Sequence, residues 1–176
     1  MAIICKEAAE DFLENVEGFE VVCECIKNSD IFVMKTDKPQ KVGMTQDRDY
    51  QKQLIKKRFG EDVEIVPMML GALPYALEND EVDAIVIDFM KGIHLNGKKE
   101  DTVLDEDYNT YVLLVSEEFK ESLEFKRFIE SYNMSLKDLM TNDMKLKEHF
   151  YNYTKNNLQE GGLEKWKIKI QVLMED

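Results

Sequence analysis

The feature that most constrains the fold is a β-α-β-α-β pattern over residues 41–88. Three short apolar runs alternate with two amphipathic segments, and these apolar runs span residues 41–44, 63–67 and 82–87. Strands that alternate with helices at this spacing are typical of a parallel sheet with right-handed crossovers. We therefore predict one co-directional sheet in which three side chains lie side by side: Val42, Ile65 and Ile85.

The last piece of this pattern recurs at the beginning of the chain. Residues 83–88 and residues 1–6 are both short apolar runs that contain Ala-Ile, and an amphipathic helix follows each of them. The copy at 83–88 has its upstream half at 79–83, whereas the other copy begins at Met1. Two similar lobes, of which the first lacks its front part, would account for both observations.

The remaining pattern divides the chain into three stretches. Apolar strands are expected at 21–26 and 31–35, with a polar turn at 28–30 between them, and the breaker run at 37–39 indicates a crossing between lobes. The apolar run at 111–115 has no polar face and is expected to be a strand buried on both sides. The rest is expected to form two helices and a last strand, at 117–132, 135–158 and 166–173. We expect a partial first lobe, a second lobe and a return to the first lobe, at 1–36, 37–110 and 111–176.

The charge balance argues against one class of partner. The chain of 176 residues carries a formal net charge of −13, and 44% of its residues are hydrophobic. Nucleic-acid binding needs a dense set of lysine and arginine side chains for phosphate contacts, which this acidic chain lacks. No apolar run approaches the roughly 20 residues that span a bilayer. The chain turns acidic and helical after five residues, unlike a signal peptide, so as written it is expected to be cytoplasmic.

The three cysteines are expected to be free thiols, because their number is odd and no secretory signal accompanies them. Cys23 and Cys25 would lie on one face of a strand, but a metal site would need further ligands there. The two histidines, His94 and His149, are far away in the sequence. Neither a metal nor a cofactor is therefore expected.

Four segments of the chain carry a family resemblance: KVGMT at 41–45, VEIVPM at 63–68, ALPYAL at 72–77 and EVDAIVID at 81–88. Together they resemble the second lobe of type II periplasmic solute-binding proteins. The nearest class feeds nitrate, sulfonate, taurine or thiamine-precursor ABC transporters. The resemblance implies an α/β fold with three αβα layers and a mainly parallel sheet, in which one lobe is complete and the other is partial.

The resemblance also implies a leader and a front part of the first lobe ahead of residue 1. We therefore expect an N-terminally truncated form, whose parent protein is exported or membrane-anchored and works with an ABC permease. A truncated first lobe would expose its core, and a second copy of the chain could cover it by pairing or swapping. A homo-oligomer is the expected result.

The resemblance and the sheet geometry place a ligand beyond the carboxyl ends of the parallel strands, against helix N-termini. The ligand contacts of this family map onto Thr45, Gln46, Gly71 and Asp88. Tyr75 would stand at the rim of the cleft, and Arg48 would supply a cation for an anionic ligand. No catalytic residue is assigned.

Each of these residues also has a structural explanation. Thr45 fits the N-cap of the helix that follows it, and Gly71 fits a tight turn. Asp88 fits the N-cap of a helix that begins at Phe89. Tyr75 is equally suited to filling the edge of a core, and Arg48 to a surface ion pair with a neighbouring aspartate.

Three functions are compatible with this pattern. The first is a non-catalytic solute-binding component that closes two hinged lobes on a small ligand. The second is an enzyme on the same fold, similar to some menaquinone-pathway enzymes, although only His94 and His149 offer acid–base chemistry near neutral pH. The third is the effector-sensing domain of a transcription regulator.

Overall fold

The computed structural model describes residues 1–158 and 160–174, which form two compact units. The terminal unit combines Met1–Asn28 with Asp107–Asp176, and the central unit is Ser29–Glu106. The chain crosses between the units after residues 28 and 106, rather than after residues 36 and 110 as the sequence predicts. The first crossing comes earlier because the strand at 30–34 pairs with strands of the central unit.

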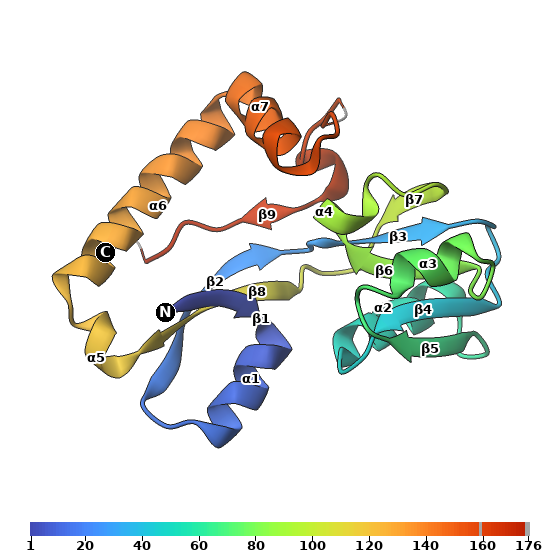
Figure 1. Cartoon of the computed structure of the whole chain (residues 1–176), viewed down its shortest axis with the longest axis horizontal. Helices are drawn as coiled ribbons and strands as arrows, with labels where there is room; N and C mark the ends of the chain where they lie inside the picture. Colours follow the sequence, from blue (N-terminus) through green and yellow to red (C-terminus); the bar gives the residue numbers. More distant parts are fainter. Residues whose placement is uncertain (159, 175–176) are drawn as a thin grey trace. The chain divides into compact units, whose positions relative to one another are not determined.

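The central unit is built on a five-stranded sheet of order β5-β4-β6-β3-β7 (Figure 1). Its elements are β3 (Asp30–Met34), β4 (Lys41–Thr45), α2 (Asp49–Phe59), β5 (Glu64–Met68), α3 (Leu73–Glu78), β6 (Ala84–Asp88), α4 (Phe89–Gly92) and β7 (Lys98–Asp101). β4 pairs in parallel with both β5 and β6, whereas β3 pairs antiparallel with β6 and β7.

The register confirms the predicted parallel core. Val42 of β4 lies opposite Ile65 of β5, and the next residue, Gly43, lies opposite Ile85 of β6. The alternation of apolar and turn residues over 41–88 therefore placed all three parallel strands correctly.

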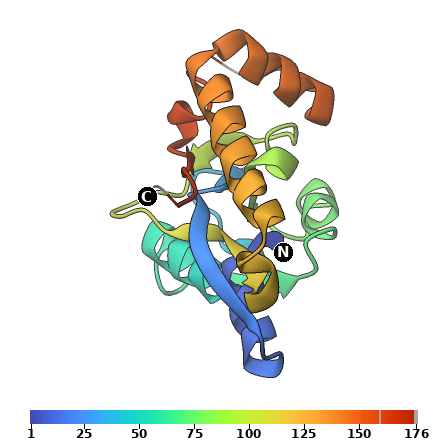
Figure 2. The ribbon, with the colours of Figure 1, turned by 90° about the vertical axis from the view of Figure 1, so that its left-hand side faces the viewer.

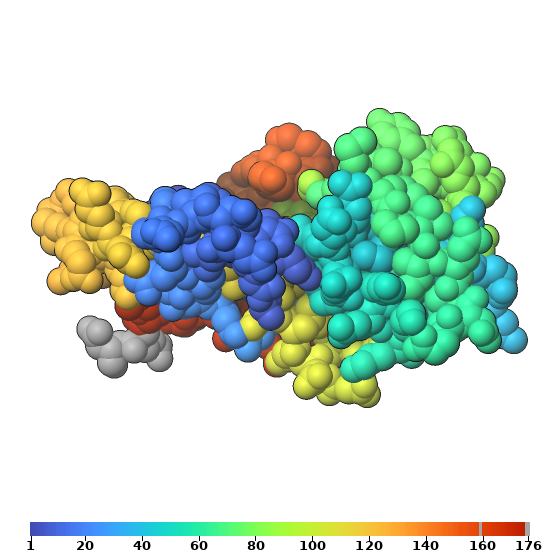
Figure 3. Space-filling model, turned by 90° about the horizontal axis from the view of Figure 1, so that it is seen from below, coloured from blue at the N-terminus to red at the C-terminus, as the bar shows by residue number. Residues whose placement is uncertain are grey.

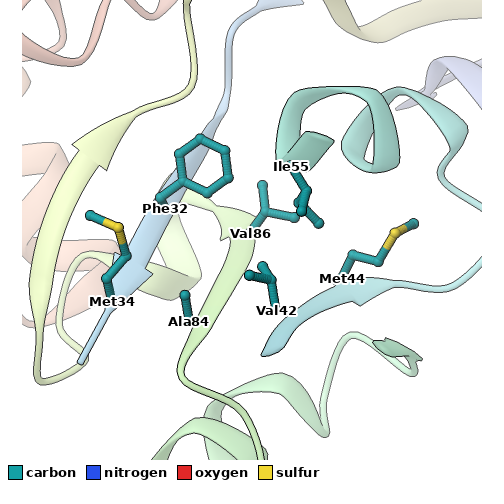
Figure 4. Close-up of a cluster of buried hydrophobic side chains, with 7 residues drawn as sticks. All are labelled: Phe32, Met34, Val42, Met44, Ile55, Ala84 and Val86. Atoms are coloured by element: carbon teal, nitrogen blue, oxygen red, sulfur yellow. The ribbon is translucent and has the colours of Figure 1, made fainter. Parts of the chain in front are cut away.

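Helices cover both faces of this sheet. On one face, α2 contributes Ile55 to a cluster of buried side chains from three strands (Figure 4): Phe32, Met34, Val42, Met44, Ala84 and Val86. On the other face α3 approaches so closely that a β-carbon at Gly43 would lie 3.0 Å from Cδ2 of Leu73. The central unit thus has the three αβα layers that the sequence predicts, and glycine at position 43 permits the close helix–sheet contact.

The terminal unit has a four-stranded sheet of order β1-β8-β2-β9. Its elements are β1 (Ala2–Cys5), α1 (Lys6–Asn15), β2 (Phe19–Lys27), β8 (Asn109–Ser116), α5 (Glu117–Lys120), α6 (Leu123–Thr141), α7 (Asp143–Thr154), η1 (Glu164–Trp166) and β9 (Lys169–Ile170). All of its recorded strand pairings are antiparallel. Among the described strands, the parallel pairing that the sequence predicts lies in the central unit, between β5, β4 and β6.

The core of the terminal unit lies between its sheet and α6, which runs beside β2 (Figure 2). Phe125 of α6 packs against Leu113 and Val115 of β8 and against Cys25 of β2, and Leu173 completes this buried cluster. Residues 112–115 of β8 are buried, as their uniformly apolar sequence predicts.

Two predictions for the end of the chain are wrong. The helix expected over 135–158 is two helices, because α6 ends at Thr141 and the side chain of Asn142 accepts a hydrogen bond from the N–H of Lys145 to start α7. The strand expected over 166–173 is reduced to Lys169–Ile170, because Lys167 adopts a left-handed conformation after η1. None of the helices in the described ranges combines the length and the apolar character that a membrane crossing requires.

Candidate functional site

The carboxyl edge of the central sheet brings together residues from four strands. β4, β5 and β6 are parallel, so Thr45, Met68 and Asp88 end their strands at this edge. β3 runs the opposite way, and its first residue, Asp30, lies directly across from Asp88. The predicted ligand-binding edge therefore also receives the start of β3.

A buried hydrogen-bonded cluster occupies this edge. Asp30 is 3% exposed, and its Oδ2 accepts two hydrogen bonds, from the Tyr50 hydroxyl at 2.6 Å and from Nε2 of Gln51 at 2.9 Å. Both donors stand in the first turn of α2. We call Asp30, Tyr50 and Gln51 the Asp30 cluster.

The Asp30 cluster also holds the end of β4. Oε1 of Gln51 accepts the backbone N–H of Thr45 at 2.9 Å, while the N–H of Gln46 donates to the carbonyl of Met68 at 2.9 Å. The hydroxyl of Thr102 donates to the carbonyl oxygen of Asp30 at 2.9 Å. These bonds fix the backbone at the point where the strand gives way to the loop before α2.

Burial makes Asp30 difficult to ionise, and its partners in the cluster oppose this effect in part. Burial raises the pKa of Asp30 from its usual 3.8 to about 6. The hydrogen bonds from Tyr50 and Gln51 lower that pKa in part. The charge of Asp88 raises it and the charge of Arg48 lowers it. One further carboxyl group and one guanidinium thus act on Asp30 at this edge.

Of two predicted site residues that could cap a helix, Asp88 does so and Thr45 does not. Asp88 caps α4, since its Oδ1 accepts the N–H of Met90 at 3.0 Å. Thr45 does not cap α2, which is a correction: α2 begins at Asp49, because the chain makes a left-handed turn at Asp47 first. Arg48 occupies the cap position of α2 and supplies no side-chain cap.

The other predicted residues lie outside the Asp30 cluster. Gly71 is exposed in the turn after β5, has no positive φ, and would allow a β-carbon without any atom within 4 Å. Tyr75 is 68% exposed on α3, so it is not a core residue. Gln46 is exposed. Among the described residues, no hydrogen bond links Gly71 or the Tyr75 hydroxyl to the cluster.

The sequence reasoning missed Asp30, Tyr50 and Gln51 as site residues. It interpreted residues 28–30 as a polar turn, whereas all three are buried, and the Ser29 hydroxyl is buried without a hydrogen-bond partner among the described residues. A polar run that directly precedes a wholly apolar strand was the available signal, because buried polar groups require specific partners.

The histidines and a cavity of the central unit lie elsewhere. His94 and His149 are both exposed and belong to different units. His94 lines a cavity of about 270 Å³ together with Lys35 and Leu77. Lys35 follows the end of β3, so this cavity lies at the opposite edge of the sheet from Asp30.

No family model matches the chain, and no curated protein matches it either. Solved structures do match. A ligand-binding component of an ABC-type import system from Staphylococcus aureus, with zinc bound, has a TM-score of 0.68 and 12% identity, and the match covers 98% of this chain and 67% of that one. A Candida albicans protein, described as exhibiting the generic periplasmic binding protein structural fold, has a TM-score of 0.60 and 14% identity over 97% of this chain and 64% of that one.

A third structure, of a protein from Archaeoglobus fulgidus, has a TM-score of 0.53 and 13% identity, covering 88% of this chain and 63% of that one. These likenesses show that the chain has the periplasmic binding protein fold, as the sequence resemblance implies. The chain spans about two thirds of the length of each of these structures. At such low identity the likeness establishes the fold and not the ligand.

Proposed function

We propose that this chain is a non-catalytic solute-binding module that binds a small polar ligand at the carboxyl edge of the central sheet. Its partner would be an ABC permease that transports this ligand. The observation that carries this proposal is the Asp30 cluster. A carboxylate whose burial raises its pKa to about 6 reduces the stability of the folded unit at neutral pH. Groups that oppose stability in this way concentrate at functional sites.

The position of the cluster supports ligand binding. In open α/β sheets, ligands bind beyond the carboxyl ends of the strands. Asp30 lies at that edge, and its partners hold both the first turn of α2 and the end of β4 in place. A rigid backbone at this point gives a ligand a prearranged surface, which lowers the entropic cost of binding.

The charges suggest what kind of ligand fits. The N-terminus of α2 carries a partial positive charge, and its cap residue Arg48 adds a positive charge that acts on Asp30. Together they suit a carboxylate, sulfonate or phosphate group. Asp88, which is half-buried at the same edge, would accept a hydrogen bond from a donor elsewhere on the same ligand.

A thermal-shift screen tests this function. Nitrate, taurine, acetate and inorganic phosphate are the probes, and we expect at least one of them to raise the melting temperature in a saturable way. Arg48→Leu should abolish that shift. Arg58→Leu is the matched control, because Arg58 lies at the far end of α2, where it pairs with Glu100 at 2.6 Å.

Two results would contradict the proposal. One is a screen in which none of the four probes shifts the melting temperature. The other is a shift that survives in Arg48→Leu, or that Arg58→Leu removes equally, because either outcome would locate binding away from the carboxyl edge.

A further inference from the structure

The loop between α4 and β7 contains the one Asn-Gly pair of the sequence, at residues 96 and 97 (Figure 1). Asn-Gly is a frequent turn sequence, because both residues tolerate backbone conformations that other side chains avoid. Asparagine is chemically labile, and it is most labile before glycine, which has no side chain to shield its backbone nitrogen. Whether such a pair reacts depends on how the fold presents the two groups.

Both reacting groups are accessible in this turn. Asn96 is exposed, so water reaches its side-chain amide. Among the described residues, no backbone carbonyl accepts a hydrogen bond from the N–H of Gly97. Gly97 has a φ of 131°, and a β-carbon there would lie 2.8 Å from the carbonyl oxygen of Met34. The packing of the turn against the end of β3 therefore requires glycine, and with it an unshielded nitrogen.

A lysine places a positive charge beside the same turn. Nζ of Lys99 donates to the carbonyl oxygen of Leu95 at 2.5 Å and to that of Gly97 at 3.3 Å. These two residues stand directly before and after Asn96 in the chain. A nearby positive charge favours the deprotonated form of an N–H group. The ammonium of Lys99 thus favours a nucleophilic nitrogen at Gly97.

We propose that Asn96 is a site of spontaneous deamidation. The backbone nitrogen of Gly97 gives up its proton to solvent and forms a bond to Cγ of Asn96. The bond from Cγ to Nδ2 breaks, and Nδ2 takes a proton from solvent and leaves as ammonia. Water then opens the cyclic imide at either of its carbonyls, which yields aspartate or isoaspartate at position 96. Water is the only co-reactant, and nothing is oxidised or reduced.

The reaction adds a negative charge to the wall of a cavity in the central unit. Asn96 lines the cavity of about 270 Å³ together with Lys35 and His94. A carboxylate in place of the neutral amide changes the charge of that wall. This cavity lies at the opposite edge of the sheet from Asp30, so the modification does not depend on the proposed ligand site.

Isoaspartate also changes the backbone, because it lengthens the chain by a methylene group just before β7. The register of β7 against β3 begins there, with Lys98 opposite Met34. The longer backbone disturbs the close contact between Gly97 and Met34, so we expect the isoaspartate form to melt at a lower temperature than the unmodified chain. Ion-exchange chromatography separates the more acidic product for this measurement. Equal melting temperatures would contradict this consequence.

Peptide mapping by mass spectrometry tests the modification itself. The chain of 176 residues is incubated in its folded state at mildly alkaline pH, where the deprotonated nitrogen is more abundant. We expect the peptide that contains Asn96 to gain the mass that an amide gains on becoming a carboxyl group, and to give the fragment ions of isoaspartate. Asn96→Gln should abolish the gain, because the longer side chain closes the ring far more slowly. Circular dichroism verifies that the variant folds.

Asn79 is the matched control within the same sample. It is exposed as well and follows α3, whose green segment forms part of the surface of the central unit in Figure 3. The residue after it, Asp80, carries a side chain, and its N–H already donates to the carbonyl oxygen of Leu77 at 3.3 Å. We expect Asn79 to stay unmodified over the time in which Asn96 reacts.

Two results would overturn the proposal. One is an Asn96 peptide that keeps its mass in the folded chain while the same peptide gains mass in urea, because the turn would then protect the amide. The other is equal modification of Asn79 and Asn96, which would show that the accessibility of the Gly97 nitrogen has no effect.

Discussion

β6 in the central unit and β1 in the terminal unit are two copies of one sequence motif in opposite circumstances. β6 has a strand on each side, and its residues Ala84 to Ile87 are fully buried. β1 has a strand on one side only, and its first two residues are exposed. The same Ala-Ile pattern therefore forms a strand in both places, whereas the number of neighbouring strands decides whether that strand becomes core or surface.

The helices that follow the two strands also differ, in whether a side chain caps their first turn. Asp88 ends β6 and caps α4 with its side chain, whereas Cys5 ends β1 and provides no side-chain cap to α1. The second copy is thus tied to its helix by a polar contact at the carboxyl edge, where the Asp30 cluster also lies. The comparison teaches that only the second copy ends in a polar residue that joins its strand to the helix after it.

Truncating the equivalent isoleucine in each copy should give the largest difference between them. Ile85→Ala removes a fully buried side chain, and we expect it to lower the free energy of unfolding by about 3 kcal/mol through lost burial and a new cavity. Ile3→Ala should cost less than about 1 kcal/mol, because that side chain is already partly in water. Urea denaturation at low protein concentration measures both. Equal costs would break the comparison.

Asp30→Asn should stabilise the protein at neutral pH. The folded pKa of about 6 exceeds the usual 3.8, so folding binds protons between these values and the stability contributed by Asp30 falls as pH rises through that window. The variant avoids this loss and should gain about 1 to 2 kcal/mol above pH 6, after allowing for an amide donor that lacks a partner. The gain should vanish near pH 4, which urea denaturation across this range would check. A gain that does not change with pH would exclude a titrating Asp30.

Removing the cap of α4 should have a smaller effect. Asp88→Ala loses the acceptor for the N–H of Met90, and we expect a cost of about 1 kcal/mol. Asp88→Ser keeps an acceptor at the cap without the charge and should retain most of the stability. If the carboxylate also contacts the ligand, Asp88→Ser will lower affinity in the thermal-shift screen while its unliganded melting temperature stays close to that of the parent. Equal destabilisation by both substitutions would show that the charge, and not the cap, matters.

Gly71→Ala should have the smallest effect on stability, within about 0.5 kcal/mol, because the added methyl group meets no atom and φ is not positive. This variant distinguishes the two explanations of Gly71, a ligand contact and a residue needed only for the turn. A ligand that approaches the backbone at this turn would bind more weakly to the variant, whereas a turn residue without a ligand would show no change. Isothermal titration calorimetry with the probe identified by the screen measures the difference. A clear loss of stability would instead show that the turn itself requires glycine.

The sequence predicted the central parallel core well because its signals are local. A strand such as 41–45 and the helix after it reveal themselves through the spacing of apolar residues, and right-handed crossovers then determine the neighbours. The Asp30 cluster could not be predicted in this way. Asp30 meets Tyr50 and Gln51 only because β3 inserts antiparallel beside β6, which is a non-local pairing that no sequence period encodes.

The same reason explains the misplaced turn at 28–30. Asn28 is buried because its side-chain amide donates to Asp107 at 2.7 Å and to the carbonyl of Lys167 at 2.9 Å. Its side-chain oxygen accepts the N–H of Tyr108 at 3.0 Å. These partners come from distant parts of the terminal unit, so Asn28 is an internal junction of that unit, whereas Ser29 and Asp30 belong to the central unit.

The thiol of Cys25 provides a built-in reporter of motion in the terminal unit. It lies in the buried cluster beneath α6, and burial raises its pKa to about 12, so it is both shielded and protonated at neutral pH. Alkylating reagents attack the exposed thiolate. The rate at which Cys25 is alkylated therefore measures how often α6 separates from the sheet and exposes this core.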